Sequence, residues 1–246
     1  MNDASRAVRL IPFGPHYRAS GVLLHITSLS SPYGIGDLGP AAFAMMDRLQ
    51  AAGQGWWQAL PLGPTGYCNS PYQSLSSFAG NGLLISPDGL IEEGLLRASD
   101  CDEGRSFPRK AVDYKAVIPF KHKLFEIAWN TFRAMSRSAL RLEYDQFCVE
   151  QAHWLDDYAL FRALKARHGG VSYLEWPAEL VRREPASLAR ARRDLAEPIE
   201  QFRFAQFLLF RQGKRLREHA RARGVDRKST RLNSSHVLTS RMPSSA

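Results

Sequence analysis

Short apolar runs and helically spaced hydrophobic residues alternate over the first third of the chain. Residues 22–26 and 56–62 are apolar runs bounded by turn-forming residues, which predicts two buried parallel strands. Between them, the apolar spacing predicts a helix that ends near Ala52, with Asp37 or a neighbour as its cap. This order predicts a βαβ unit with a right-handed crossover, and residues 83–85 are a third strand candidate.

Beyond these strands the hydrophobic period is helical. Helices are expected at residues 90–96, 120–132, 142–164 and 199–222, with a polar connector at residues 99–110. The first half of the last helix is apolar on almost every side, which predicts complete burial, and its second half is basic. The aromatic residues of these helices have the spacing of ordinary helix packing, so we interpret them as core rather than as a cofactor-binding cluster.

Composition restricts the class of protein. With 246 residues, of which 44% are hydrophobic, the chain can bury a core as one large or two small domains. The sequence shows neither an apolar run of bilayer length nor a secretory signal, so we expect a cytoplasmic location and no membrane partner. Cysteines are odd in number and widely spaced, which predicts reduced thiols rather than disulfides or a zinc site; they are Cys68, Cys101 and Cys148.

The formal net charge of +9 raises nucleic acid as a partner. Positive residues concentrate in residues 182–193 and 211–228, where we expect arginine-rich helix surfaces. Solvated helix faces explain this charge at least as well as a phosphate-binding stripe, because no aromatic residues are interleaved with residues 211–228. The sequence therefore favours no nucleic-acid partner, and a basic nucleic-acid binder stays an alternative.

Common catalytic motifs are missing from the sequence. It contains no nucleophile elbow, glycine-rich phosphate loop or paired metal ligands, so no metal or cofactor site is expected. The acids at residues 92–93 and 156–157 are neighbours on expected helices and point apart, so we interpret them as solvated or salt-bridged. His25 lies near the end of the first strand, where a buried histidine bonded to a backbone group is favoured over a pocket residue.

The loop after the second strand carries the most informative chemistry. It combines turn-forming residues with two tyrosines and small polar side chains; the candidate binding residues are Tyr67, Asn69, Ser70, Tyr72 and Gln73. Sugars present hydroxyls that need directional hydrogen bonds and a C–H face that packs on aromatic rings, so this set suits a carbohydrate ligand. A tight connection whose tyrosines cover the edge of the core is the alternative.

Several long motifs resemble those of the amylomaltase family, the bacterial 4-alpha-glucanotransferases also called disproportionating enzymes. They are GVLLHITSL (21–29), PYGIGDLG (32–39), WQALPLGPTGY (57–67), SPYQS (70–74), FAGN (78–81), VDY (112–114), WLDDYALF (154–161) and FLLFRQ (207–212). The resemblance covers about residues 18–225. Two departures are Ile26, where the family usually has proline, and Cys68, where it usually has glycine.

The resemblance implies a (β/α)₈ TIM barrel with an inserted helical subdomain, here incomplete. It also implies transfer of α-1,4-glucan segments between maltooligosaccharides through a covalent glycosyl-enzyme intermediate, without a cofactor. Tyr72 would contact the sugar at the cleavage point, Ser70 would bind a donor-side hydroxyl and Tyr67 would add an aromatic surface. The family's catalytic aspartate and glutamate lie beyond the region of resemblance, so we expect an inactive fragment, with a non-catalytic glucan-binding module as the alternative.

The sequence and the resemblance together divide the chain into five segments. Residues 1–17 form an N-terminal extension, 18–90 the first βα units with the sugar-binding loop, 91–198 a mostly helical insertion, 199–225 a barrel helix, and 226–246 an unrelated tail. Within it, residues 227–246 are rich in serine and lack acidic residues and an apolar period, which predicts disorder. It resembles translated adapter sequence, which indicates a truncated reading frame.

Overall fold

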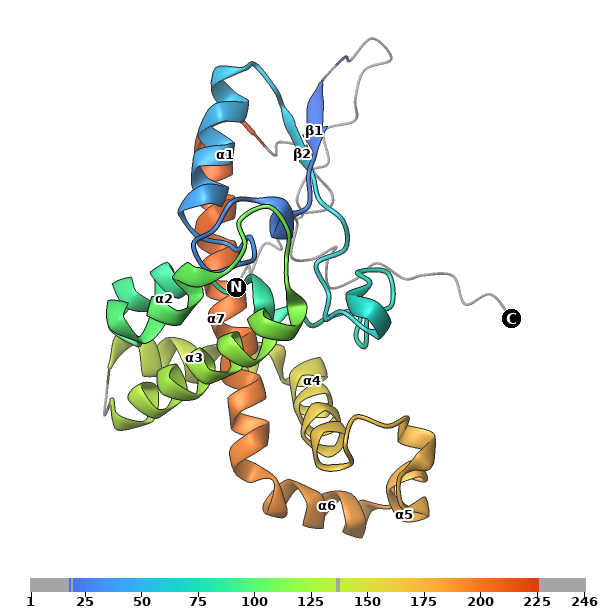
Figure 1. Ribbon diagram of the computed structural model, residues 1–246. Coiled ribbons are helices and arrows are strands. Elements are labelled where there is room, and N and C mark those ends of the chain that lie inside the picture. The colour runs from blue at the N-terminus through green and yellow to red at the C-terminus, as the bar shows by residue number, and fades with distance from the viewer. Residues whose placement is uncertain (1–17, 19, 136–137, 226–246) are drawn as a thin grey trace, which may run out of the picture.

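A computed structural model of the chain describes residues 18, 20–135 and 138–225 (Figure 1). The predictions for residues 1–17 and 226–246 lie outside this part. The strands are β1 (Gly21–Leu23) and β2 (Trp56–Gln58). The α-helices are α1 (Pro40–Ala51), α2 (Pro87–Glu92), α3 (Tyr114–Ala134), α4 (Ala139–Arg167), α5 (Ala178–Val181), α6 (Pro185–Asp194) and α7 (Ala196–Ala222). Five short 3₁₀ helices span Ile26–Ser28, Tyr67–Asn69, Gly82–Leu84, Ala98–Ser106 and Tyr173–Glu175.

The predicted βαβ unit is present. Strands β1 and β2 pair in parallel, with Gly21 opposite Trp56, and α1 connects them. Both strands are shorter than predicted: β1 gives way to a 3₁₀ turn at Ile26, and β2 ends before Pro61, which has no N–H for a sheet ladder. This sheet has two strands in the described part of the chain, which is too few to close a barrel.

Residues 83–85 are not a strand, which corrects the prediction. They belong to a 3₁₀ turn in which the Asn81 side chain accepts a hydrogen bond from the Leu83 N–H at 3.0 Å. On either side of the turn, two glutamines of α7 bind the backbone of Gly80 and Ser86. These amides satisfy polar groups that a neighbouring strand would otherwise bind, so a short apolar run is buried without pairing.

Helix α7 lies at the centre of the molecule (Figure 1), where it packs against α4, α1 and α3. Its first half is mostly buried, although Phe202 and Phe210 are half-buried and the predicted complete burial is not reached. The ring centroids of Phe204 and Phe132 of α3 lie 4.5 Å apart. Tyr144 of α4 joins this cluster edge-on to Phe132. The aromatic stripes of α3, α4 and α7 therefore form the core, which confirms that interpretation.

A buried ion pair joins the β1–α1 connection to α3. Asp37 does not cap α1, because Gly39 occupies the N-cap position. Instead an Asp37 oxygen lies 3.6 Å from Lys121 Nζ, which also donates to the Ile85 carbonyl at 2.7 Å. Burial raises the pKa of Asp37 and lowers that of Lys121, and the attraction between the two groups opposes both shifts.

A second acidic residue links α2 to the rest of the fold. Asp88 lies inside the first turn of α2, whose N-cap position is Ser86. Its carboxylate accepts a hydrogen bond from the Tyr33 hydroxyl at 2.5 Å. Asp88 therefore ties α2 to the β1–α1 connection, in addition to placing a negative charge near the positive end of the helix dipole.

Candidate functional site

The loop between β2 and the Gly82–Leu84 turn doubles back on itself. Its ends are joined by a hydrogen bond from the Asn81 N–H to the Leu62 carbonyl at 2.8 Å. Two glycines lie where the loop crosses itself. A Cβ at Gly66 would lie 2.2 Å from the Gln73 backbone carbonyl oxygen, so glycine is required there, whereas a Cβ at Gly63 would lie 2.4 Å from the Ser74 side-chain Oγ. The close approach of two backbone segments thus fixes the shape of the loop.

The predicted binding residues share this loop but face different surroundings. Tyr72 is 58% exposed and Gln73 is also exposed, so both side chains are accessible to a ligand. Ser70 accepts a hydrogen bond from the Tyr72 N–H at 3.3 Å, which fixes their relative position. Asn69 instead lines a neighbouring cavity. Tyr67 lies in the Tyr67–Asn69 turn, and its side chain is outside the described part of the structure.

The turn that contains these residues has an unusual backbone. Cys68 and Asn69 have φ angles of 52° and 57°, in the left-handed region. Asparagine tolerates this conformation, whereas a residue such as cysteine adopts it at a cost of roughly 1–2 kcal/mol. This backbone gives a physical reason for glycine at the position of Cys68, and it leaves the Cys68 side chain exposed.

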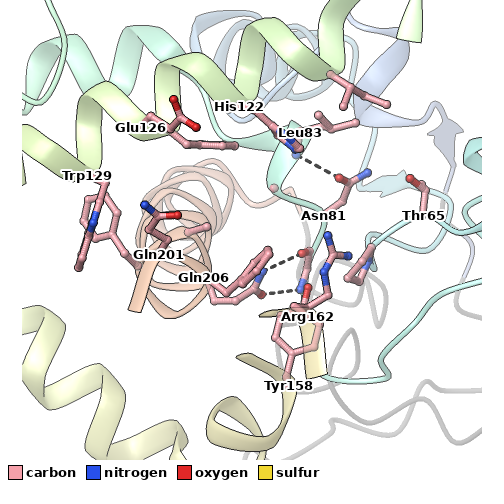
Figure 2. A pocket seen from close by; sticks show the side chains of 18 of the residues that line it. Thr65, Asn81, Leu83, His122, Glu126, Trp129, Tyr158, Arg162, Gln201 and Gln206 are labelled. Carbon is pink, nitrogen blue, oxygen red and sulfur yellow. Dashed lines mark hydrogen bonds between the residues drawn. The ribbon is translucent and has the colours of Figure 1, made fainter. Parts of the chain in front are cut away.

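A cavity of about 360 Å³ lies beside the loop (Figure 2). Its walls come from α3, α4, α7 and the two ends of the loop. The residues that line it with polar side chains are Thr65, Asn69, Asn81, His122, Glu126, Arg162, Gln201 and Gln206; those with aromatic rings are Phe125, Trp129, Tyr158, Phe202 and Phe204. We call it the α3–α4–α7 cavity.

One glutamine fixes the wall of this cavity. Gln206, which is 3% exposed, accepts a hydrogen bond from the Gly80 N–H at 2.8 Å and donates to the Gly80 carbonyl at 3.0 Å (Figure 2). Gln212 makes the same pair of bonds with Ser86, at 2.7 and 3.1 Å. Helix α7 thus holds the segment that ends the loop.

The structure corrects the prediction for His25. Its side chain is half-buried at the end of β1, but its Nδ1 atom is buried without a hydrogen-bond partner in the described part of the chain. Desolvation lowers the pKa of this imidazole and so favours its neutral form. The carbonyl of the preceding residue, Leu24, accepts a hydrogen bond from the Trp57 indole N–H at 2.6 Å.

Acidic and basic residues pair as the sequence indicated. Asp156 lies 2.7 Å from Arg203, and Asp157 lies 3.0 Å from Arg183. The acids at positions 92 and 93 pair with the basic half of α7, where Arg211 also contacts Glu143. The basic half of α7 is therefore largely occupied with intramolecular contacts.

Sequence reasoning missed the α3–α4–α7 cavity. Most of its polar side chains lie on three helices, and the sequence pattern gave them no role, although His122 and Glu126 are one turn apart beside the aromatic stripe of α3. That proximity was the only local signal. Within the described residues, no cluster of histidine, cysteine and acidic side chains suits a metal ion, and no helix has the length and apolar character to cross a membrane.

The comparisons with known proteins agree on one family. The family profile described as 4-alpha-glucanotransferase matches residues 24–228. The 4-alpha-glucanotransferases of Synechocystis and Thermus thermophilus are each 43% identical over 208 residues, which is 85% of this chain and 41% of those proteins. The chloroplastic or amyloplastic enzyme of Solanum tuberosum is 36% identical over 214 residues, 85% of this chain and 37% of that protein.

A solved structure shows the same relation. The amylomaltase of Streptococcus agalactiae, determined in complex with acarbose, has a TM-score of 0.80 and 36% identity, covering 85% of this chain and 42% of the other. The chain thus spans about 41% of the length of the curated relatives it matches. These findings confirm the resemblance identified from the sequence motifs.

Proposed function

Because the chain belongs to the 4-alpha-glucanotransferase family, we propose that it supplies the glucan-binding part of an enzyme that transfers α-1,4-glucan segments between maltooligosaccharides. In this proposal the βαβ unit is the start of a (β/α)₈ barrel, residues 91–198 are the helical insertion, and the enzyme acts in the cytoplasm without a cofactor.

The exposed loop after β2 carries the proposal. It follows the carboxyl end of a parallel strand, where α/β folds place their ligands, and it presents Tyr72 at 58% exposure next to Ser70 and Gln73. Tyr72 packs on the C–H face of a glucosyl ring, while Ser70 and Gln73 bind its hydroxyls. Asn69, which lines the neighbouring cavity, and Tyr67 also contribute to glucan binding in this proposal.

In the proposed reaction, a carboxylate attacks the anomeric carbon while a second carboxylic acid protonates the leaving oxygen, and the acceptor sugar then displaces the enzyme. The candidate acids at positions 156 and 157 are held by arginines, so they are poor candidates for this chemistry. The described loop binds and orients the glucan. We therefore expect the 246-residue polypeptide to bind maltooligosaccharides without transferring them.

Affinity electrophoresis in gels that contain amylose tests the binding role. We expect the chain to be retarded by amylose, and Tyr72→Ala to abolish most of the retardation because the stacking surface is lost. Tyr173→Ala is the matched control, because Tyr173 is 50% exposed on the Tyr173–Glu175 turn far along the chain from the loop. Equal retardation of the wild type and the Tyr72 variant would refute the assignment.

A non-catalytic glucan-binding module is the second candidate, favoured by the engagement of the described acid pairs in ion pairs. Incubation with maltotriose distinguishes it from a transferase: formation of longer and shorter maltooligosaccharides by the chain would exclude the module. Nucleic-acid binding is disfavoured, because Arg211, Arg215 and Arg223 of α7 contact acidic residues. A nucleic-acid-binding protein would show an affinity for DNA or RNA that falls steeply as the salt concentration rises.

A further inference from the structure

The carboxyl end of the two-stranded sheet carries two polar side chains that have no hydrogen-bond partner in the described part of the chain. His25 follows β1, and Gln58 is the last residue of β2, directly before the loop that presents Tyr72. Strands β1 and β2 lie side by side (Figure 1). Both residues are therefore at the edge where parallel sheets place their ligands.

The two side chains lie on the same face of the sheet. Trp57 is fully buried in the core, and successive residues of a strand point to opposite faces, so Gln58 and its partner Leu23 share the other face. This face is open, since Leu23 is 60% exposed. The pairing continues to Leu24, whose N–H donates to the Gln58 carbonyl at 2.9 Å, and the backbone at His25 is extended. His25 therefore falls on the face of Leu23.

The surroundings of His25 determine which ring nitrogen is the donor. Its Nδ1 atom is buried without a partner, whereas Nε2 reaches solvent and makes no hydrogen bond to the described residues. Because burial lowers the pKa of the ring, the neutral form is favoured. A proton on Nδ1 would be a buried donor without an acceptor, so the neutral ring carries its proton on Nε2. His25 thus offers one N–H donor.

The surface formed by these side chains suits an uncharged ligand with hydroxyl groups. The exposed Gln58 amide offers donors and an acceptor, and neither it nor the neutral imidazole attracts an ion. From the usual strand spacing and rise per residue, the Cα atoms of Gln58 and His25 are roughly 8 Å apart. Between them, Leu23 provides an apolar surface for the C–H face of a ring.

We propose that His25 and Gln58 bind hydroxyls of one glucosyl unit of the maltooligosaccharide that Tyr72 holds, with Leu23 beneath the sugar ring. This inference rests on the proposed function for the choice of a glucan, and on the uncharged donors and acceptors for the choice of a neutral ligand. The two residues orient the glucan at the base of the loop, next to the strand ends.

Titration of the 246-residue chain with maltotriose tests the inference by ¹⁵N NMR of the His25 ring and the Gln58 side-chain amide. The free ring should show protonation on Nε2 alone, and maltotriose should shift the Nε2 and amide signals. His25→Ala and Gln58→Ala should each weaken binding about 5-fold, the effect of one lost hydrogen bond. His25→Gln, whose amide N–H can replace that of Nε2, should restore most of the affinity. Gln146→Ala, on an exposed part of α4, is the matched control and should change nothing.

The outcomes separate this inference from the proposed function. Unchanged maltotriose affinity in correctly folded His25→Ala and Gln58→Ala, with binding still lost in Tyr72→Ala, overturns the inference and leaves the proposed function standing. A free ring protonated on Nδ1 also overturns it, because the donor would then be the buried nitrogen. A larger shift of the His25 signal with inorganic phosphate than with maltotriose overturns it as well, because the site would be an anion site. Failure of the wild type to bind maltotriose contradicts the proposed function and, with it, the inference.

Discussion

Replacement of Gln206 by leucine should destabilise the protein more than an average core substitution. The side chain is 3% exposed, and its amide satisfies both the N–H and the C=O of buried Gly80. Leucine has a similar volume but neither donor nor acceptor, so two backbone groups lose their partners. Each unsatisfied buried group costs about 1–3 kcal/mol, so the free energy of unfolding should fall by roughly 2–6 kcal/mol. That is a large part of the roughly 5–15 kcal/mol typical of a domain.

Urea unfolding followed by circular dichroism measures this loss, and amide hydrogen exchange locates it. Exchange at Gly80 should rise in Gln206→Leu, while exchange at Ser86 rises in the matched variant Gln212→Leu, whose amide makes the equivalent bonds six residues further along α7. Only the first variant should also disturb the NMR signals of the loop. A loss below about 1 kcal/mol in Gln206→Leu would refute the argument, because it would mean that water or relaxation satisfies Gly80.

Gln206→Glu adds a test by pH. Burial raises the pKa of the introduced carboxyl, and its protonated form both donates and accepts, as the amide does. The stability of this variant relative to the wild type should therefore be greatest at low pH and fall as the pH rises through the raised pKa. A difference that does not change with pH would show that the side chain leaves its buried position.

Three further predictions follow from buried or strained groups. Lys121→Met leaves Asp37 buried without a cation and should cost about 3–5 kcal/mol near neutral pH. Because burial raises the pKa of Asp37, the loss should shrink as the pH falls and the carboxyl takes up a proton, and Asp37→Asn should restore most of it. Gly213→Ala on α7, where a Cβ meets nothing within 4 Å, should stabilise by about 0.5–1 kcal/mol. Burial, aided by nearby acids, raises the pKa of the Cys101 thiol to about 11, so iodoacetamide at pH 8 should modify exposed Cys68 first.

Each of these predictions has a contradicting result. Equal destabilisation of the Lys121 variant at pH 4 and pH 7, measured by urea unfolding, would show that the charge of Asp37 is not the cause. A lower melting temperature in Gly213→Ala would mean that this part of α7 is not regular helix. Mass spectrometry that finds equal labelling of Cys101 and Cys68 in the folded chain would contradict the burial of Cys101.

The sequence predicted the elements whose hydrophobic pattern is local. The βαβ unit and the long helices α3, α4 and α7 were found because their apolar residues repeat at the period of one element. The apolar run at residues 83–85 was assigned wrongly, because what decides its shape is a pair of glutamines 126 positions away from their partners. Asp37 was taken for a cap for the same reason: its partner Lys121 lies on a distant helix.

The candidate site could be predicted only where it is contiguous. The loop residues from Asn69 to Gln73 were identified because aromatic and polar groups are concentrated in one stretch, and their role in binding stays a prediction. The polar groups of the cavity come from α3, α4 and α7, so their convergence depends on helix packing that no single stretch encodes. The role assigned to His25 was wrong, because its Nδ1 atom is buried without a hydrogen-bond partner in the part of the chain that the structure describes.

The hydrogen bonds of Gln206 and Gln212 also determine the order in which parts of the protein fold during synthesis. Gly80 and Ser86 are bonded by residues that the ribosome adds 126 positions later. Contacts so distant in sequence form late, because a long stretch of chain must close first. During translation, the backbone groups of Gly80 and Ser86 therefore remain accessible to solvent and to chaperones until α7 emerges from the exit tunnel.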